Sequence, residues 1–339
     1  MNKTAFLFPG QGSQIVGMGR DLHQASSAAR RLFERASTLL GFDLARLCFE
    51  GPEDTLHLTA NLQPALLTVS VAAYTLLESG SGLRPDRVAG HSLGEWSALV
   101  AVGAIEFGDA VRLVRLRGAA MQEAVPAGRG AMGAVLGLDG DTVAKVCEEV
   151  TATYRADGIV VPANYNGAGQ VVISGDKAAV DRAAAVLKAR GAKRVMPLPV
   201  SAPFHSPLME SAARRLAEAL ESIVIRTPRV PLVRNVDARA TDDPEEIREG
   251  LVSQVASPVR WEDSLLAMAE YGVRHFVEVG PGKVLAGIVK RVVPGVRISS
   301  CERTVDVASL AAEFPRAFPS ALASAVPPAA AEAKKETSV

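Results

Sequence analysis

The chain of 339 residues has little cysteine, few aromatic residues and no excess of either charge. Its three cysteines, Cys48, Cys147 and Cys301, are far apart in the sequence, which argues against a disulfide framework and against a zinc site. Lys plus Arg number 37 and Asp plus Glu number 37, so the formal net charge is zero. A neutral chain does not indicate nucleic acid or a membrane surface as its partner.

Targeting signals and long hydrophobic runs are also missing. The first apolar run is very short and is broken at Pro9, which excludes a secretory signal peptide of ordinary length. We find no stretch that approaches the apolar length needed to cross a bilayer. With the sparse cysteines, these features predict a cytoplasmic protein in a reducing compartment.

The residues that are present predict an α/β fold. Hydrophobic residues make up 48% of the chain and aromatic residues only 5%, so the core must be built mainly from Ala, Val, Leu and Ile. Short apolar runs at 4–8, 87–90, 232–236 and 275–279 read as buried strands, with helical patterns between them. We expect a large α/β domain with a parallel central sheet, formed by residues 1–127 and 200–314.

Residues 128–199 have a different pattern. The order is strand, helix, strand, strand, helix, strand, which is the order of a ferredoxin-like unit. We therefore expect a smaller ferredoxin-like βαββαβ domain inserted into the larger one. Residues 315–339 are rich in Ala and Pro with a charged end, and this composition predicts a disordered tail.

Residues 90–94 read Gly-His-Ser-Leu-Gly, which fits the pattern G-x-S-x-G. In such an elbow a serine occupies a tight turn from a strand to a helix, and its small neighbours let the hydroxyl project outward. The amide of Leu93 would then point toward the place where an oxyanion forms. The alternative is a plain serine N-cap of the following helix. The strand-like VAG before it and the helical EWSALVAVGA after it favour Ser92 as a nucleophile.

A serine nucleophile needs a base, and the chain has five histidines. His205 lies between two prolines in a loop that leads into a helix, a rigid position for a base. His91 adjoins Ser92, so lining the pocket is its best role. A lone loop histidine is more often structural, and the preference for His205 rests on the resemblance below.

The motifs together resemble the malonyl-CoA:acyl carrier protein transacylases and the acyltransferase domains of fatty-acid and polyketide synthases. The resemblance extends to about residue 313 and implies an α/β-hydrolase-like large domain. It is carried by FPGQGSQ at 8–14, GHSLGEW at 90–96, LRG at 116–118, NYNGAGQVVISG at 164–175, PFHSPLM at 203–209, NVDA at 235–238 and EVGPGKVL at 278–285.

The resemblance implies a role for each site residue. Ser92 is the acylated nucleophile, and His205 takes its proton and returns one to the leaving thiol. The backbone amides of Gln11 and Leu93 form the oxyanion hole. The backbone carbonyl of Gln254 orients the histidine, so the Asp of a triad is not required.

The resemblance also implies that Arg117 pairs with the free carboxylate of the malonyl group. Arginine suits this role because its planar, permanently charged fork binds a carboxylate with two hydrogen bonds. A solvated helix charge is the alternative, which fits Arg112 and Arg115 better. A bulky Phe204 would crowd a 2-methyl branch, so we expect malonyl rather than methylmalonyl. The expected pocket-lining residues are His91, Phe204, Asn166 and Met121.

These roles predict transfer of malonate from malonyl-CoA to the phosphopantetheine thiol of acyl carrier protein, by a ping-pong mechanism, for fatty-acid synthesis. No metal or redox cofactor is expected, and the protein is expected to be a monomer. Carrier proteins are acidic, so a basic surface near the pocket should receive them. The candidate residues are Lys188, Arg190, Lys193, Arg194, Lys290 and Arg291.

Three alternatives remain at this point. A free-standing acyltransferase that serves a polyketide synthase would use the same residues. A serine esterase or thioesterase would share the elbow but would have no use for Arg117. A non-catalytic carrier-docking module is opposed by the presence of both Ser92 and His205.

Overall fold

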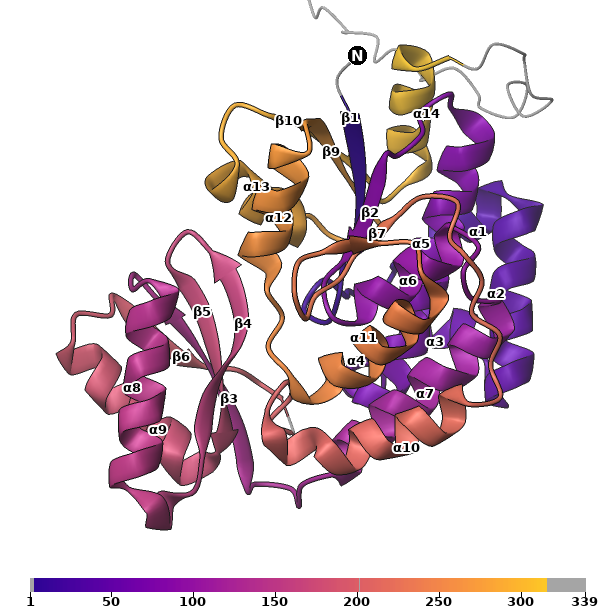
Figure 1. Cartoon of the computed structure of the whole chain (residues 1–339). Helices are drawn as coiled ribbons and strands as arrows, with labels where there is room; N and C mark the ends of the chain where they lie inside the picture. The colour runs from indigo at the N-terminus through magenta and orange to yellow at the C-terminus, as the bar shows by residue number, and fades with distance from the viewer. Residues whose placement is uncertain (1–2, 201, 316–339) are drawn as a thin grey trace, which may run out of the picture.

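The structure is a computed structural model that describes residues 3–200 and 202–315, and it contains two separate β-sheets (Figure 1). The larger sheet has six strands in the order β10-β9-β1-β2-β7-β8. Its strands are β1 (Lys3–Phe8), β2 (Arg87–Gly90), β7 (Leu232–Val233), β8 (Ala240–Thr241), β9 (Val273–Val279) and β10 (Arg297–Cys301). The pairs from β10 to β7 are parallel, whereas β7 and β8 are antiparallel. The sheet is therefore mixed at one edge rather than wholly parallel as expected from the sequence.

The side chains of β1 point alternately to the two faces of the larger sheet, and both faces are covered. Phe6 and Phe8 belong to one apolar cluster, and Ala5 and Leu7 belong to another. Successive side chains of a strand point to opposite faces, so an unbroken apolar run serves both layers. Helices α12 (Trp261–Glu270) and α13 (Val284–Val292) pack on the second face.

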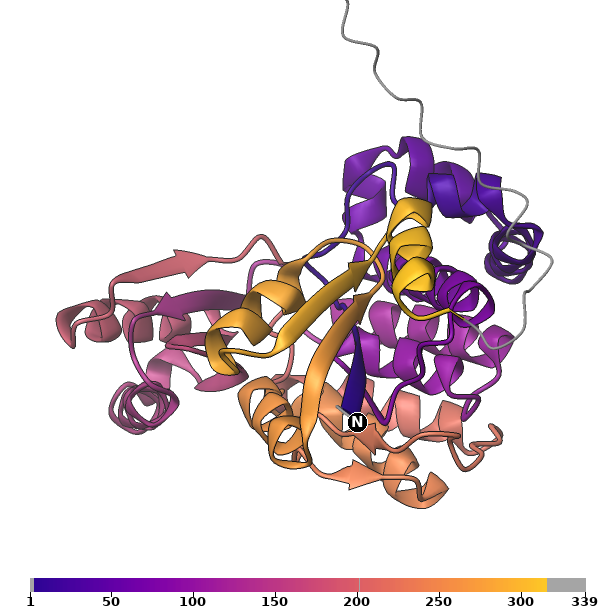
Figure 2. The same cartoon turned by 90° about the horizontal axis from the view of Figure 1, so that it is seen from above.

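The first face carries the larger set of helices, and Figure 2 shows them gathered on the far side from the small sheet. They are α1 (Arg20–Ala25), α2 (Ser27–Leu40), α3 (Leu44–Glu50), α4 (Glu53–His57), α5 (Thr59–Gly80), α6 (Leu93–Ala101), α7 (Phe107–Glu123), α10 (Glu210–Leu220), α11 (Pro244–Ala256) and α14 (Thr304–Glu313). Side-chain N-caps fix the first residues of several of these helices. Asp43 caps α3, and Asp243 caps α11 with Pro244 at the first helical position.

The smaller sheet is antiparallel and has the order β4-β5-β3-β6. Its strands are β3 (Gly130–Leu136), β4 (Val160–Gly167), β5 (Gln170–Asp176) and β6 (Arg194–Pro197), and its helices are α8 (Gly140–Thr153) and α9 (Lys177–Ala189). Val135 and Ile173 pack with the helices, whereas Met132 and Val172 belong to the main core. One face of this sheet is thus turned toward the larger part of the molecule, as Figures 1 and 2 show.

Helix α5 corrects one expectation from the sequence. It has 22 residues and is long and apolar enough to cross a membrane by length and composition, although we expected no such stretch. Its most apolar window is 83% buried inside the protein, which is typical of the core helix of a globular domain.

Most elements lie where the sequence pattern predicts them, but the C-terminal part is more structured than expected. Helix α13 follows Lys283, and after it come β10 and α14, which the apolar runs of the sequence did not indicate. Short 3₁₀ turns lie at Arg155–Asp157 and Pro207–Met209. The expected disordered tail lies outside the described residues, except for Pro315.

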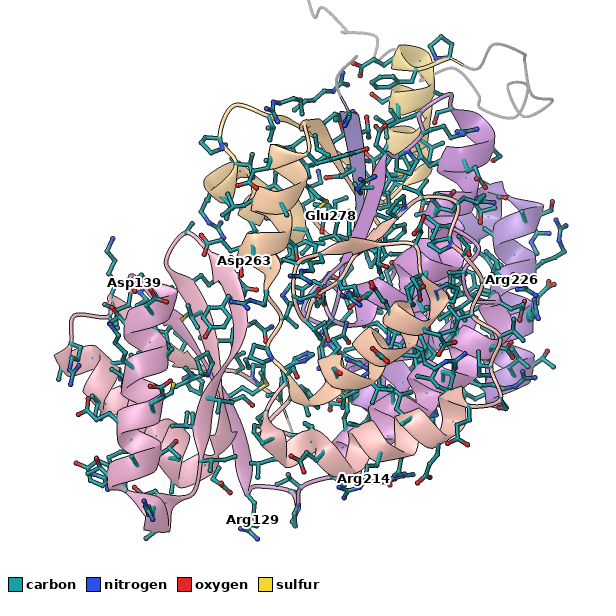
Figure 3. The ribbon with its side chains drawn as sticks, in the orientation of Figure 1. Arg129, Asp139, Arg214, Arg226, Asp263 and Glu278 are labelled. Carbon is teal, nitrogen blue, oxygen red and sulfur yellow. The ribbon has the colours of Figure 1, made fainter. Side chains whose placement is uncertain are left out.

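Charged side chains lie mostly at the surface. In Figure 3, Arg129, Asp139 and Arg214 are on the periphery, whereas Glu278 lies among the elements of the larger sheet. Glu278 is buried and accepts hydrogen bonds from the backbone amides of Leu285 and Ala286 at the start of α13. Burial raises the pKa of Glu278 to about 7.

Candidate active site

The turn between β2 and α6 has the geometry of a nucleophile elbow. A Cβ on Gly90 would lie 1.9 Å from the carbonyl carbon of Gly94, and a Cβ on Gly94 would lie 1.9 Å from the carbonyl oxygen of Phe8. Neither contact is possible for a larger residue, which explains both glycines of the motif. Ser92 itself has φ of 51° and ψ of −104°, a strained conformation for a residue that is not glycine.

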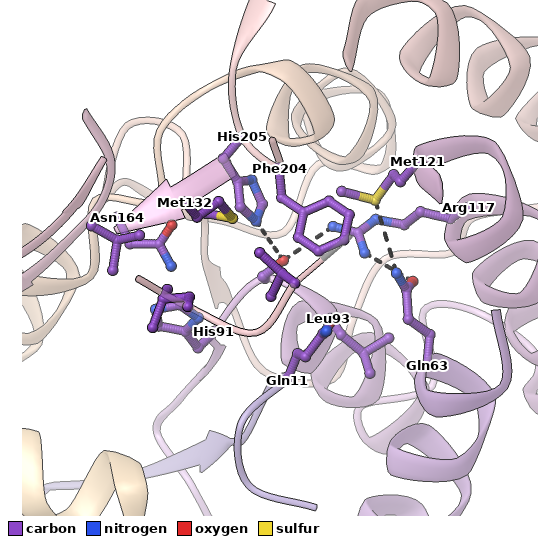
Figure 4. A pocket seen from close by; sticks show the side chains of 14 residues that line it. Gln11, Gln63, His91, Leu93, Arg117, Met121, Met132, Asn164, Phe204 and His205 are labelled. Carbon is purple, nitrogen blue, oxygen red and sulfur yellow. Dashed lines mark hydrogen bonds between the residues drawn. The ribbon is translucent and has the colours of Figure 1, made fainter. Parts of the chain in front are cut away.

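The side chain of Ser92 decides between an elbow and a plain helix cap. Ser92 occupies the N-cap position of α6, yet its side chain makes no capping hydrogen bond. Its Oγ lies 2.8 Å from Nε2 of His205 and accepts a hydrogen bond from Nη2 of Arg117 at 3.1 Å. The hydroxyl therefore points into the site, where Figure 4 shows His205 and Arg117 directed toward the same point.

His205 is placed to act as a neutral base. Its Nδ1 lies 2.8 Å from the backbone carbonyl oxygen of Gln254, which accepts only from a protonated nitrogen. That bond fixes the tautomer in which Nε2 is unprotonated and accepts from Ser92. Burial, and then the nearby charge of Arg117, lower the pKa of His205 to about 3, so the imidazole is neutral near pH 7.

Arg117 is buried in α7, with 2% of its surface exposed. Its Nη1 donates to Oε1 of Gln63 at 2.8 Å, and its Nη2 donates to Oε1 of Gln254 at 3.0 Å. Among residues 3–200 and 202–315, its Nε has no hydrogen-bond partner, and no carboxylate forms a salt bridge with the Arg117 side chain. Burial lowers the pKa of Arg117 only to about 10, so the side chain stays charged.

The side chain of Gln254 connects Arg117 to a buried acid. Its Nε2 donates to a carboxylate oxygen of Glu95, to the backbone carbonyl of Ser92 at 3.1 Å and to Oδ1 of Asn235 at 3.2 Å. Burial raises the pKa of Glu95 to about 8. Glu95, the acid that lies beside the arginine, is therefore mainly protonated at neutral pH and does not neutralise it.

These groups line a small cavity of about 100 Å³. Ser92, His205 and Arg117 are among its walls, together with Gln11, Leu93, His91, Phe204 and Met121, all of which the sequence had placed at the site. Gln254 acts from behind this wall through the contacts above. Asn166 does not line this cavity. It lies next to it, where its Oδ1 is 2.9 Å from Nε2 of His91.

Two backbone amides complete the site. In the part of the chain that the structure describes, the amides of Gln11 and Leu93 have no hydrogen-bond acceptor. Both residues line the cavity beside Ser92. Free N–H groups at a helix start and in a glycine-rich loop are suited to bind a developing oxyanion.

A second cavity of about 490 Å³ adjoins the first and shares five wall residues with it, namely Gln11, His91, Asn164, Val172 and Leu198. Asn166, Lys283 and Arg291 lie along its other walls. Two cationic side chains beside a passage to the nucleophile suit an anionic substrate. Within the described residues there is no group of three or more His, Cys, Asp or Glu that could hold a metal ion.

Sequence reasoning missed Gln63, Glu95 and Asn235. Gln63 had one detectable signal, because it is a polar residue at the start of the almost uniformly apolar stretch of α5. Glu95 gave a similar signal in the small-residue helix α6. Asn235 lies far from the motif in sequence, and only the fold brings it to the elbow.

Comparison with known proteins agrees with this geometry. The profile of the acyl transferase domain family matches residues 5–320. The malonyl CoA-acyl carrier protein transacylase of Escherichia coli (strain K12) is 51% identical over 301 residues, which are 88% of this chain and 96% of that protein. The corresponding protein of Bacillus subtilis (strain 168) is 50% identical over 292 residues, with 86% and 91% covered.

The chain belongs to the malonyl-CoA:acyl carrier protein transacylase family. Solved structures of this family have the same fold. The transacylase from Coxiella burnetii superposes with a TM-score of 0.89 at 41% identity, covering 93% of this chain and 98% of that one. A malonyl-transacylase in complex with a type II polyketide acyl-carrier protein superposes with a TM-score of 0.88 at 45% identity, covering 92% and 99%.

Proposed function

We propose that this protein transfers a malonyl group from malonyl-CoA to the phosphopantetheine thiol of acyl carrier protein and so supplies extender units for fatty-acid synthesis. The observation that carries the proposal is the buried guanidinium of Arg117, which has no carboxylate partner among the residues that the structure describes and whose Nη2 lies 3.1 Å from Oγ of Ser92. A buried charge that lacks a counter-ion is costly. The free carboxylate of a malonyl group would supply that counter-ion while its thioester carbonyl lies at the nucleophile.

The first half of the reaction loads the serine. Oγ of Ser92 attacks the thioester carbonyl carbon, and its proton passes to Nε2 of His205. The amides of Gln11 and Leu93 stabilise the oxyanion. The carbon–sulfur bond then breaks, the thiolate of CoA takes the proton from His205, and CoA leaves as a thiol. The product is a malonyl ester of Ser92 with a neutral histidine.

The second half reverses these steps with a different thiol. The carrier thiol gives its proton to His205 and attacks the ester carbonyl, after which Ser92 leaves and recovers the proton. Both thioesters use one site in turn, so the kinetics are ping-pong. Arg117 holds the acyl group by its far end, which positions the ester for the incoming thiol.

The finer architecture is part of the same proposal. Residues 1–127 and 200–314 form an α/β-hydrolase-like catalytic domain, and residues 128–199 form an inserted ferredoxin-like domain. The strand order β4-β5-β3-β6 and the separate apolar cluster under α8 and α9 support the second assignment. The parallel strands that lead to the elbow support the first.

The carrier protein would dock on basic side chains near the second cavity. Arg291 lines that cavity, and Lys290, its neighbour on α13, is exposed. Lys188, Arg190, Lys193 and Arg194 are also exposed, and Arg190 already pairs with Glu149 at 2.7 Å. Charge reversal at a true contact raises the KM for carrier and leaves that for malonyl-CoA nearly unchanged. Equal effects on both substrates refute the contact.

The remaining expectations from the sequence also stay proposals. The reaction needs no metal or redox cofactor, because a thioester carbonyl is already reactive toward a serine that has a base and an oxyanion hole. The protein acts in the cytoplasm as a monomer. A role beside a polyketide synthase is the second candidate, which the similarity to a transacylase in complex with a type II polyketide acyl-carrier protein favours. A serine esterase is disfavoured by Arg117.

Intact-mass spectrometry tests the proposed function directly. After mixing with malonyl-CoA, a malonyl adduct is expected on the wild-type protein and none on Ser92→Ala. Addition of carrier protein should move the adduct to the carrier rather than release free malonate. The absence of an adduct on Ser92 overturns the proposal, and release of malonate alone indicates a hydrolase. Fatty-acid and polyketide carriers compared as acceptors decide between the two pathways.

A further inference from the structure

Asn235 is a fully buried polar residue just beyond the end of β7. Leu232 of that strand pairs in parallel with Val88 of β2. The carboxyl ends of both strands therefore meet at the same edge of the sheet, where β2 delivers the elbow. This placement brings a side chain 143 positions away in sequence into contact with Ser92.

The amide of Asn235 holds the elbow at two points. Its Oδ1 accepts a hydrogen bond from the backbone N–H of Ser92 at 2.7 Å, and its Nδ2 donates to the backbone carbonyl of Gly90 at 2.8 Å. These two backbone groups flank His91, at the point where the strand has ended and the helix has not begun. A primary amide is the side-chain group that offers one such donor and one such acceptor together.

Further hydrogen bonds fix the positions of Asn235 and of the Ser92 backbone. The backbone carbonyl of Asn235 accepts from the amide of Arg260 at 2.8 Å, and its Oδ1 also accepts from Nε2 of Gln254. The same Nε2 donates to the carbonyl of Ser92. Side chains thus bind both the N–H and the C=O of a residue that holds a strained φ of 51°.

We propose that Asn235 is a positioning residue for acyl transfer, whose side-chain amide keeps the backbone of Ser92 in its strained conformation. This inference rests on the proposed function. The φ and ψ of Ser92 set the direction of Oγ toward His205 and of the next amide, that of Leu93, toward the oxyanion. Without the amide, the turn relaxes and both reacting groups lose their alignment.

Two substitutions separate this role from a general effect on folding. Asn235→Ala removes both hydrogen bonds, and we expect the rate of acylation by malonyl-CoA to fall about 100-fold, as for a small misplacement of reacting groups. The KM should change little, because Arg117 still binds the malonyl carboxylate. Asn61→Ala is the matched control. Asn61 is also buried and donates to a backbone carbonyl, that of Thr55, but it lines neither cavity.

Asn235→Asp gives a readout that a merely structural role would not produce. A protonated carboxyl group keeps one O–H donor and one acceptor in nearly the same shape, whereas an ionised one cannot donate to Gly90. The ionisable groups nearby are His91 between the two bonded backbone groups, Glu95 on α6, Arg234 beside Asn235, and Arg117 and His205 beyond Gln254. The acylation rate of Asn235→Asp, divided by that of the wild type at the same pH, should therefore rise as the pH falls.

The experiment measures single-turnover acylation by malonyl-CoA from about pH 5.5 to pH 8.5, with circular dichroism at each pH to confirm the fold. Asn61→Asp, the matched control for this change, should show a flat ratio to wild type. A folded Asn235→Ala protein within about threefold of the wild-type rate overturns the proposal. If that variant does not fold, a flat ratio for folded Asn235→Asp overturns it. Failure of the wild type to acquire malonate refutes the proposed function instead.

Discussion

Glu95 and Arg117 contact the two ends of one amide without forming an ion pair with each other. Nη2 of Arg117 donates to Oε1 of Gln254 at 3.0 Å, and Nε2 of Gln254 donates to Glu95. Burial raises the pKa of Glu95 to about 8, so the acid is mainly neutral at neutral pH. Within residues 3–200 and 202–315, no ionised carboxylate pairs with this buried positive charge, and a substrate carboxylate can supply the missing charge.

Replacement of Arg117 should change which acyl group is accepted. In Arg117→Ala the malonyl carboxylate loses its charge-assisted hydrogen bonds, each worth about 1.5–3 kcal/mol. We expect the kcat/KM for malonyl-CoA to fall about 100-fold or more, while acetyl-CoA, which has no carboxylate, loses little.

The measurement is the mass of the acyl adduct on Ser92 with each donor. Arg115→Ala is the control, because Arg115 lies on the same helix, pairs with Asn61 and lines neither cavity. An equal fall in kcat/KM with both donors would show that Arg117 does not bind the malonyl carboxylate.

The buried acid predicts how stability depends on pH. The pKa of Glu95 is raised from 4.5 to about 8, so the folded protein binds its proton more tightly than the unfolded chain does. The stabilising contribution of this group is fully present below about pH 4.5 and is lost as the pH rises through 8. Glu95→Gln, which stays neutral, should lose less stability than the wild type between pH 6 and pH 9.

Urea unfolding at several pH values checks this difference. Glu245→Gln is a matched control for the same chemical change, because Glu245 is exposed at the start of α11. A wild-type slope that Glu95→Gln leaves unaltered would show that another group titrates in this range.

Because His205 is neutral, we expect the kcat/KM for acylation not to fall as the pH drops through 6.5. Burial first, and then the charge of Arg117, lower the pKa of His205 to about 3, so its base form persists at every higher pH. The kcat/KM for acylation by malonyl-CoA should stay level from pH 7 down to about pH 5. In Arg117→Ala, assayed with acetyl-CoA, one cause of the shift is gone and an acid limb should move toward pH 6.5. A wild-type rate that halves near pH 6.5 contradicts this assignment.

How far the sequence predicts the site depends on the range of each interaction. The elbow is local, because Gly90 and Gly94 are required by contacts within a few residues and with one neighbouring strand. The hydrogen bonds that Asn235 and Gln254 make to the backbone of Ser92 are not local. These residues reach Ser92 only through the order of strands and the packing of α11. The pattern of apolar runs placed the main strands well but missed β10, which pairs with β9, and α14, which packs against α5.

The shape of the acyl pocket gives the last prediction, which concerns Phe204. Its ring lines the cavity beside Ser92 and is almost fully buried. A 2-methyl branch on the malonyl group would need part of this space, and one such group is worth about 1–3 kcal/mol in a pocket. Phe204→Ala should therefore raise the ratio of methylmalonyl to malonyl transfer about 10-fold or more.

Phe107→Ala, at the start of α7 and equally buried but outside both cavities, controls for lost core packing. Competition between the two thioesters, followed by the mass of the Ser92 adduct, measures the ratio. If both variants leave that ratio as in the wild type, the ring of Phe204 does not select the extender acid.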